Sequence, residues 1–141
     1  MAWPDPRFTD NGDGTVTDNM TNLVWMKNTN VFGLQNWYDA LNSCYNSIGG
    51  WRLPNILELL SLVDFNYEDP YADGFILHGA LPHGHPFTNL DGNFNHWTST
   101  IASVGFGTGA WSINMGVIGG DVSQDGQAIG MNRVWCVRDP E

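Results

Sequence analysis

The sequence predicts an α+β fold in which two helices pack on small, twisted antiparallel sheets joined by long loops. Short apolar or alternating runs, separated by Asn, Asp and Gly, are typical of strands and occur before residue 28 and after residue 95. Two runs with helical caps lie between them. Seventeen Gly and seven Pro in 141 residues favour many turns. We expect one domain, residues 1–141, with a single core.

The first part of the chain, Phe8 to Lys27, is expected to form strand, turn, strand, turn and strand. The sequence NGDG at residues 11–14 is a strong hairpin signal. The same stretch is rich in Asp and Gly, like a calcium loop, but Gly12 occupies a position where the calcium template needs a ligand. A turn is therefore the better interpretation.

Two helices are expected in the middle of the chain. The first, Trp37 to Asn46, has Asn36 as its N-cap and an apolar face that turns Cys44 inward. The second, Ile56 to Val63, begins with Asn55 and Glu58 at capping-box spacing and is apolar nearly all round. Arg52, in the apolar run before it, is expected to be partly buried and paired, with Glu58 the nearest acid in sequence.

The second half of the chain has a long irregular stretch and then strands. Residues 64–95 show no clear periodicity, and long irregular stretches are usually functional or packed by their own side chains. Strands are expected at residues 96–100, 110–115 and 134–138. Residues 116–132, which are polar and rich in Gly, are expected to form a loop or an irregular hairpin.

Charge excludes several classes of partner. Five Lys and Arg face fifteen Asp and Glu, a formal net charge of −10, so the domain is a poor binder of nucleic acid and of anionic polysaccharides. No apolar stretch is long enough to span a membrane, and we expect no direct membrane insertion. The first four residues have neither a basic nor a hydrophobic region, so an export signal is expected to lie outside this chain.

Metal sites can be considered at three groups of residues. His78, His83 and His85 could ligate zinc, but a zinc site needs further ligands and orienting partners, and His85 is better explained as ordering its loop by hydrogen bonding. Two cysteines, Cys44 and Cys136, are too few for a Cys-rich zinc site; they are either two buried thiols or one disulfide. Weak calcium candidates, alternatively a solvated acidic loop, are Asp64, Glu68, Asp69 and Asp73.

Several runs, in order, resemble the C-terminal domain family of the Legionella collagen-like adhesin and its relatives, the Fibrobacter succinogenes major paralogous domains. One departure is Cys136, where many relatives carry Pro. The matching runs are residues 7–18 (RFTDNGDGTVTD), 23–25 (LVW), 51–55 (WRLPN), 81–82 (LP), 84–89 (GHPFTN), 97–100 (WTST), 110–111 (AW), 134–135 (VW) and 137–138 (VR).

The resemblance implies a C-type lectin-like fold, export and a surface role. In that fold a disulfide commonly ties the first helix to the last strand, which implies pairing of Cys44 with Cys136. Some members of the wider class are varied by diversity-generating retroelements, and residues 112–133 lie where such variation occurs. The calcium-dependent sugar-binding signatures of true C-type lectins are absent, so no cofactor is expected and calcium alone is left open.

Catalysis is not expected. The fold class includes enzymes that use active-site cysteines, but here both cysteines are expected to be structural. No Ser-His-Asp or Gly-x-Ser-x-Gly arrangement stands out, and acidic pairs such as Asp64 and Glu68 are common in loops and mostly inert.

A binding function is the preferred interpretation. Trp25, Trp51, Trp97, Trp111 and Trp135 are expected in the core rather than as sugar-stacking platforms. We expect an extracellular or cell-surface recognition module that binds a glycan or a surface protein through its C-terminal loops. The alternative is a hypervariable retroelement display protein that binds arbitrary protein ligands. Oligomeric state is left open. The candidate binding residues, which could equally be ordinary loop polarity, are Asp91, Asn93, Asn95, Ser112, Asn114, Asp121, Asp125, Gln127 and Asn132.

Overall fold

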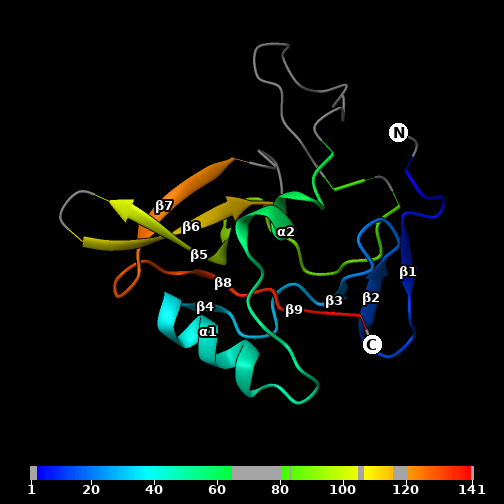
Figure 1. The fold of residues 1–141 in the computed structure, drawn as a ribbon, viewed down its shortest axis with the longest axis horizontal. Helices are drawn as coiled ribbons and strands as arrows, with labels where there is room; N and C mark the ends of the chain where they lie inside the picture. The colour runs from blue at the N-terminus through cyan, green and yellow to red at the C-terminus, as the bar shows by residue number, and fades with distance from the viewer. Residues whose placement is uncertain (1–2, 65–80, 83, 105–106, 116–120, 141) are drawn as a thin grey trace, which may run out of the picture.

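The computed structural model describes residues 3–64, 81–82, 84–104, 107–115 and 121–140, and it has two β-sheets and two short helices (Figure 1). The expected α+β class is confirmed. No helix in these ranges is long and apolar enough to cross a membrane. The helices are α1 (Trp37–Asn46) and α2 (Ile56–Leu60).

The first sheet contains the N-terminal strands and the last strand of the chain. Its order is β1 (Phe8–Asp10), β2 (Thr15–Asp18), β3 (Val24–Met26) and β9 (Val137–Arg138), with every neighbouring pair antiparallel. The turn between β1 and β2 has Gly12 and Gly14 at positive φ, 78° and 88°, as expected for the predicted hairpin. Asp10 and Asp13 accept backbone hydrogen bonds from residues of that turn.

The second sheet has the order β4 (Leu34–Gln35), β8 (Asn132–Arg133), β5 (Asn95–Val104), β6 (Gly107–Asn114) and β7 (Val122–Gly126). β5 and β6 are longer than the apolar pattern suggests, since β5 continues to Val104 and β6 already begins at Gly107. β7 lies inside the stretch expected to be a loop or irregular hairpin. It is almost wholly polar and lies at the sheet edge, where it is held by its antiparallel pairing with β6.

The helix caps follow the sequence prediction. Asn36 accepts from the Asp39 N–H at the start of α1, and Asn55 and Glu58 form the reciprocal capping box of α2. α2 ends at Leu60 rather than at Val63: the Ser61 N–H still bonds to Leu57, four residues back, but the Leu62 and Val63 N–H groups bond to carbonyls three residues back. The expectation that α2 is buried nearly all round is wrong, since Leu57 is 74% exposed.

The core consists of two apolar clusters joined by the C-terminal segment. Trp25, Leu59 and Trp135 lie in the first cluster, and Trp51 and Trp97 lie in the second. Their predicted burial is confirmed. Trp111 is only partly buried and belongs to neither cluster; Ile113, two residues further along β6 on the same face, packs in the first cluster instead.

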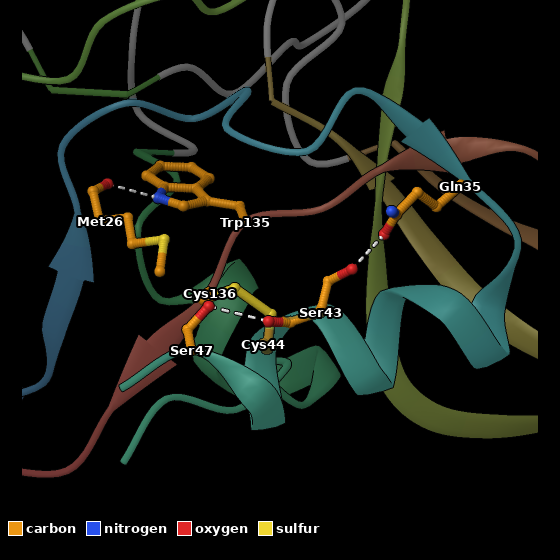
Figure 2. The surroundings of a disulfide bond; sticks show 7 residues. All are labelled: Met26, Gln35, Ser43, Cys44, Ser47, Trp135 and Cys136. Atoms are coloured by element: carbon orange, nitrogen blue, oxygen red, sulfur yellow. Dashed lines mark hydrogen bonds between the residues drawn. A yellow bond between two sulfur atoms is a disulfide. The ribbon is translucent and has the colours of Figure 1, made fainter. Parts of the chain in front are cut away.

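A disulfide joins Cys44 of α1 to Cys136, so the pairing implied by the family resemblance is confirmed (Figure 2). Their Cα atoms are 5.6 Å apart and both residues are fully buried. Figure 2 also shows Trp135 donating from Nε1 to the Met26 carbonyl, at 2.8 Å. The Cys136 carbonyl in turn accepts from the Met26 N–H at 3.2 Å. The disulfide therefore fixes α1 to the segment that also bonds β3.

Arg52 is partly buried and paired, as expected. Its guanidinium makes two hydrogen bonds of 2.6 Å to the Glu58 carboxylate and one of 2.7 Å to Asp139. Burial of Glu58 opposes ionisation, but hydrogen bonds from Arg52 and the Asn55 N–H outweigh it and lower the pKa of Glu58. The Arg52 backbone exchanges two hydrogen bonds with Val137, so this pair also ties α2 to the last strand.

A second ion pair, between Arg7 and Asp18, is almost completely buried. The guanidinium contacts both carboxylate oxygens, at 2.7 and 2.9 Å, and donates a third hydrogen bond to the Ser61 carbonyl. Asp18 also accepts from the Met20 N–H and the Thr21 hydroxyl. The pair links the β1–β2 hairpin to the residue that follows α2.

Replacing Cys44 and Cys136 together with Ala is expected to lower the free energy of unfolding by about 4–5 kcal/mol, because the bond closes a 92-residue separation in the unfolded chain. Urea unfolding of the variant and the parent measures the difference. Intact mass after alkylation of the native protein without reductant is the control. Two alkylated thiols would contradict the disulfide.

Candidate ligand-binding site

The nine predicted binding residues differ in exposure. Four of them are buried, and their side chains make hydrogen bonds to other parts of the fold. Whether any of the nine contacts a ligand stays a prediction. Asn93 and Asp121 are exposed, Asp91, Asn95 and Asp125 are partly exposed, and Ser112, Asn114, Gln127 and Asn132 are buried.

Four of these residues form one hydrogen-bonded network across β5, β6, β7 and β8. Asn95 donates from Nδ2 to the Ser112 hydroxyl at 3.1 Å, and that hydroxyl donates to Asp125 Oδ2 at 2.8 Å. Asn132 donates from Nδ2 to the same Asp125 oxygen at 2.9 Å. We call these four residues the Asp125 network. It satisfies polar groups inside the sheet and fixes the strands relative to one another.

Gln127 anchors the chain after β7 to α1 and β6. Its Nε2 donates to the Gly109 carbonyl at 3.0 Å, and its Oε1 accepts from the Tyr38 hydroxyl at 3.0 Å. Its backbone carbonyl accepts from the Trp37 N–H, the first helical residue of α1. Gln127 thus satisfies a helix N–H that has no partner within the helix.

The segment Gly126 to Met131, here called the tip loop, is held tightly at its base. The Gly130 N–H donates to the Gly126 carbonyl at 2.8 Å. A Cβ at Gly130 would lie 2.8 Å from that carbonyl oxygen and 3.1 Å from the Trp97 ring, so only glycine fits. Figure 1 shows the chain after β7 running back toward the start of α1.

The tip loop exposes two large apolar side chains. Ile129 is 87% exposed and Met131 is 55% exposed, and Tyr38, whose hydroxyl reaches Gln127, is 47% exposed. Sequence reasoning missed these positions because it looked for polar residues. The available signal was an Ile and a Met within a Gly-rich polar stretch.

At the other end of the sheet, Arg133 and Asn114 hold the segment that precedes β5. Arg133 donates to the Asn89 carbonyl at 2.7 Å, and its guanidinium lies 4.9 Å from the Phe94 ring centre. Asn114 donates from Nδ2 to the Gly92 carbonyl. Asp91 accepts from the Asn93 backbone and side-chain amides. Asn89 and Asn93 are the exposed residues of this group.

The metal candidates are only partly visible. Glu68, Asp69 and Asp73, and also His78 and His83, lie outside the described residues. Within the described part of the chain no group of three His, Cys, Asp or Glu residues could hold a metal ion. His85 stacks on Phe87 and burial lowers its pKa, while its Nδ1 is buried without a hydrogen-bond partner. Its backbone N–H, rather than its ring, bonds within the loop, to Pro82.

Comparison with known proteins identifies the family. The model of the Lcl C-terminal domain matches residues 14–138. The chain belongs to this family. The match includes both helices, the disulfide, the Asp125 network and the tip loop, and membership in the Lcl C-terminal domain family indicates a surface, adhesin-type domain. No curated protein and no solved structure matched the chain.

The Asp125 network gives a stability prediction. Asp125→Ala removes the acceptor of two hydrogen bonds, from Ser112 and Asn132, and leaves these buried donors without a partner. We expect a loss of about 1–3 kcal/mol in the free energy of unfolding. Asp121→Ala is the matched control, because its side chain is exposed, and it should change stability by less than about 0.5 kcal/mol. Equal stability of the two variants in urea unfolding would contradict the role of the network.

Proposed function

We propose that this domain is a non-catalytic recognition module at the cell surface or outside the cell, and that the tip loop binds a protein surface. The observation that carries the proposal is the pair Ile129 and Met131, exposed on a loop whose base is fixed by buried hydrogen bonds. Exposed apolar side chains that lie together lower the solubility of a monomer, and they indicate a surface that a partner covers. Met and aromatic side chains are also enriched at protein interfaces.

The rigid base favours binding by the tip loop. A loop that is already ordered loses little conformational entropy when its partner docks. Gln127 fixes the loop on α1 and β6, and the absence of a side chain at Gly130 lets the loop lie close to Trp97. The loop can therefore present its two apolar residues in one geometry, as binding loops on rigid scaffolds do.

The charge of the domain limits the kinds of protein surface that it can bind. With a formal net charge of −10, the domain repels acidic surfaces and attracts basic ones, while a neutral surface is not repelled. Asp121, exposed before β7, and Asp125, partly exposed within it, add negative charge on the strand that leads into the tip loop. A neutral or basic protein surface with an apolar depression is the expected ligand.

We also propose a C-type lectin-like fold that needs no metal for binding. The disulfide from the first helix to the C-terminal segment and the two small sheets support this assignment. Both cysteines are bonded to each other, and Asp125 is used as a hydrogen-bond acceptor within the sheet, which supports a non-catalytic role. Calcium is not required by the proposed contacts, since these are apolar.

The alternative function, a hypervariable display protein, requires that only some positions between 112 and 133 vary. Buried residues between positions 112 and 133, including Ser112, Gln127 and Asn132, hold the fold, so random substitution there would leave buried partners unsatisfied. Variation would have to fall on exposed positions such as Asp121 and Ile129. Related chains from one genome that differ mainly at those positions would favour this alternative.

The double substitution Ile129→Ser and Met131→Ser tests the proposal. Labelled domain is applied to an array of purified surface proteins and glycans, with calcium and with a chelator. We expect retention on one or more neutral or basic proteins, unchanged by the chelator, and a loss of affinity of at least about tenfold in the double variant. The melting temperature should stay close to that of the parent, because both side chains are exposed.

Leu57→Ser is the matched control, since Leu57 is 74% exposed but lies on α2. It should bind like the parent. Retention on glycans alone, or undiminished binding by the double variant, would contradict the assignment of the tip loop.

A further inference from the structure

Arg138, in the last strand, differs from the other cationic side chains of the protein. The chain has five Lys and Arg and fifteen Asp and Glu. Arg7, Lys27, Arg52 and Arg133 each lie within 4.0 Å of a carboxylate oxygen, although Arg133 does so only at 3.8 Å. Arg138 has no such partner among the described residues, and its Nε is buried without a hydrogen bond. Its Nη groups are not among the buried atoms without a partner, so they are the ones that can meet an anion from solution, and a hydrogen bond between two charged groups is a strong one.

The guanidinium of Arg138 is held in one position. Its central carbon lies 4.8 Å from the centre of the Trp51 ring, a cation–π contact. Gly49 makes room for this contact, because a Cβ there would lie 3.1 Å from Arg138 Nη1 and 3.3 Å from Trp51 Nε1. Gly49 also has φ +123°, which disfavours any other residue. A guanidinium ordered in this way loses little entropy when it binds a planar anion.

Arg138 lines a surface hollow of about 520 Å³, here called the Arg138 hollow. Its walls are partly apolar: Met26, Phe32 and Trp51 contribute, and Ile48, which is 100% exposed, stands at the rim. One fixed cation beside an apolar wall is complementary to a molecule with one anionic group and an apolar body.

Asp13 also lines the hollow, and its negative charge opposes the binding of an anion there. Its Oδ1 accepts hydrogen bonds from the Thr15 hydroxyl and N–H, which, with a smaller contribution from the Arg138 charge, lower the pKa of Asp13. The side chain is exposed to water, where charges are strongly screened. Its repulsion is therefore weaker than the direct contact that Arg138 offers.

We propose that the Arg138 hollow binds a small organic carboxylate with an apolar body. The carboxylate accepts hydrogen bonds from the Arg138 guanidinium, whose planar set of N–H groups matches its two oxygens. The apolar body lies against Phe32 and Ile48. This site is separate from the tip loop: Ile48 follows the C-terminal end of α1, whereas the tip loop contacts its first residue, and ten helical residues span about 15 Å.

Phenylacetate is a suitable probe, and phenylacetamide is its uncharged counterpart. In two-dimensional NMR of the ¹⁵N-labelled domain, phenylacetate should shift the Arg138 Nε–H and Trp51 indole signals saturably, whereas phenylacetamide should bind at least about tenfold more weakly. Arg138→Gln should weaken phenylacetate binding by at least about tenfold as well. Asp13→Asn should strengthen it, because it removes the nearby negative charge.

Ile48→Asp is a second variant. It leaves Arg138 in place, and it should fold like the parent because Ile48 is fully exposed. It places a negative charge at the rim and should weaken phenylacetate binding at least about tenfold. Ile129→Asp adds the same charge on the tip loop and should leave it unchanged. Absence of saturable shifts at Trp51 and Arg138, equal binding of the amide, parent-like binding by Ile48→Asp, or weaker binding by Asp13→Asn would each overturn the proposal.

Discussion

The segment Arg133 to Arg138 is the constraint on which the rest of the structure depends, because it takes part in both sheets and contacts both apolar clusters. Arg133 lies in β8 of the second sheet, and Val137 lies in β9 of the first. Between them, Trp135 packs in the first cluster and Cys136 in the second. Cys136 is bonded to α1, and Val137 exchanges hydrogen bonds with Arg52 just before α2. Neither sheet is large. The shared segment, Arg133 to Arg138, joins the two apolar clusters into one core.

The same arrangement positions the candidate site. Asn132, just before the shared segment, reaches Asp125 on β7, and Gln127 connects the chain after β7 to the first turn of α1. The tip loop therefore begins and ends on elements that the disulfide and the core hold in place. Its base is ordered, since the Gln127 backbone bonds to Thr108 and Trp37 and the Gly130 N–H bonds to Gly126, so Ile129 and Met131 are exposed on a fixed support. The Arg138 hollow depends on the segment in the same way, since Arg138 stacks on Trp51 at its far end.

Local chemistry made the helices and the first hairpin predictable. The caps at Asn36 and Asn55 and the glycines at 12 and 14 act within a few residues, so the sequence alone indicates their structure. β7 could not be recognised in this way, because its stability comes from pairing with β6 rather than from its own residues. The nine candidate residues show the same limit. Polarity indicated Ser112 and Gln127 as candidate binding residues, but whether a polar side chain meets solvent or a buried partner depends on strands that are distant in sequence. The apolar tip was missed for the complementary reason, that an Ile or a Met usually indicates the core.

Native-state hydrogen exchange tests most directly whether the shared segment unites the fold. The Met26, Arg52 and Val137 N–H groups donate across it, to the carbonyls of Cys136, Val137 and Arg52 respectively, while the Gly130 N–H donates within the tip loop. If the account is right, the first three amides exchange only through global unfolding and share one free energy of opening, the highest in the domain, while Gly130 exchanges through a smaller local opening. Met26, Arg52 and Val137 amides that exchange as fast as the Gly130 amide, while the Asp18 amide, which bonds to Leu23 within the first sheet, remains protected, would show that this sheet is stable without the shared segment and would contradict the account.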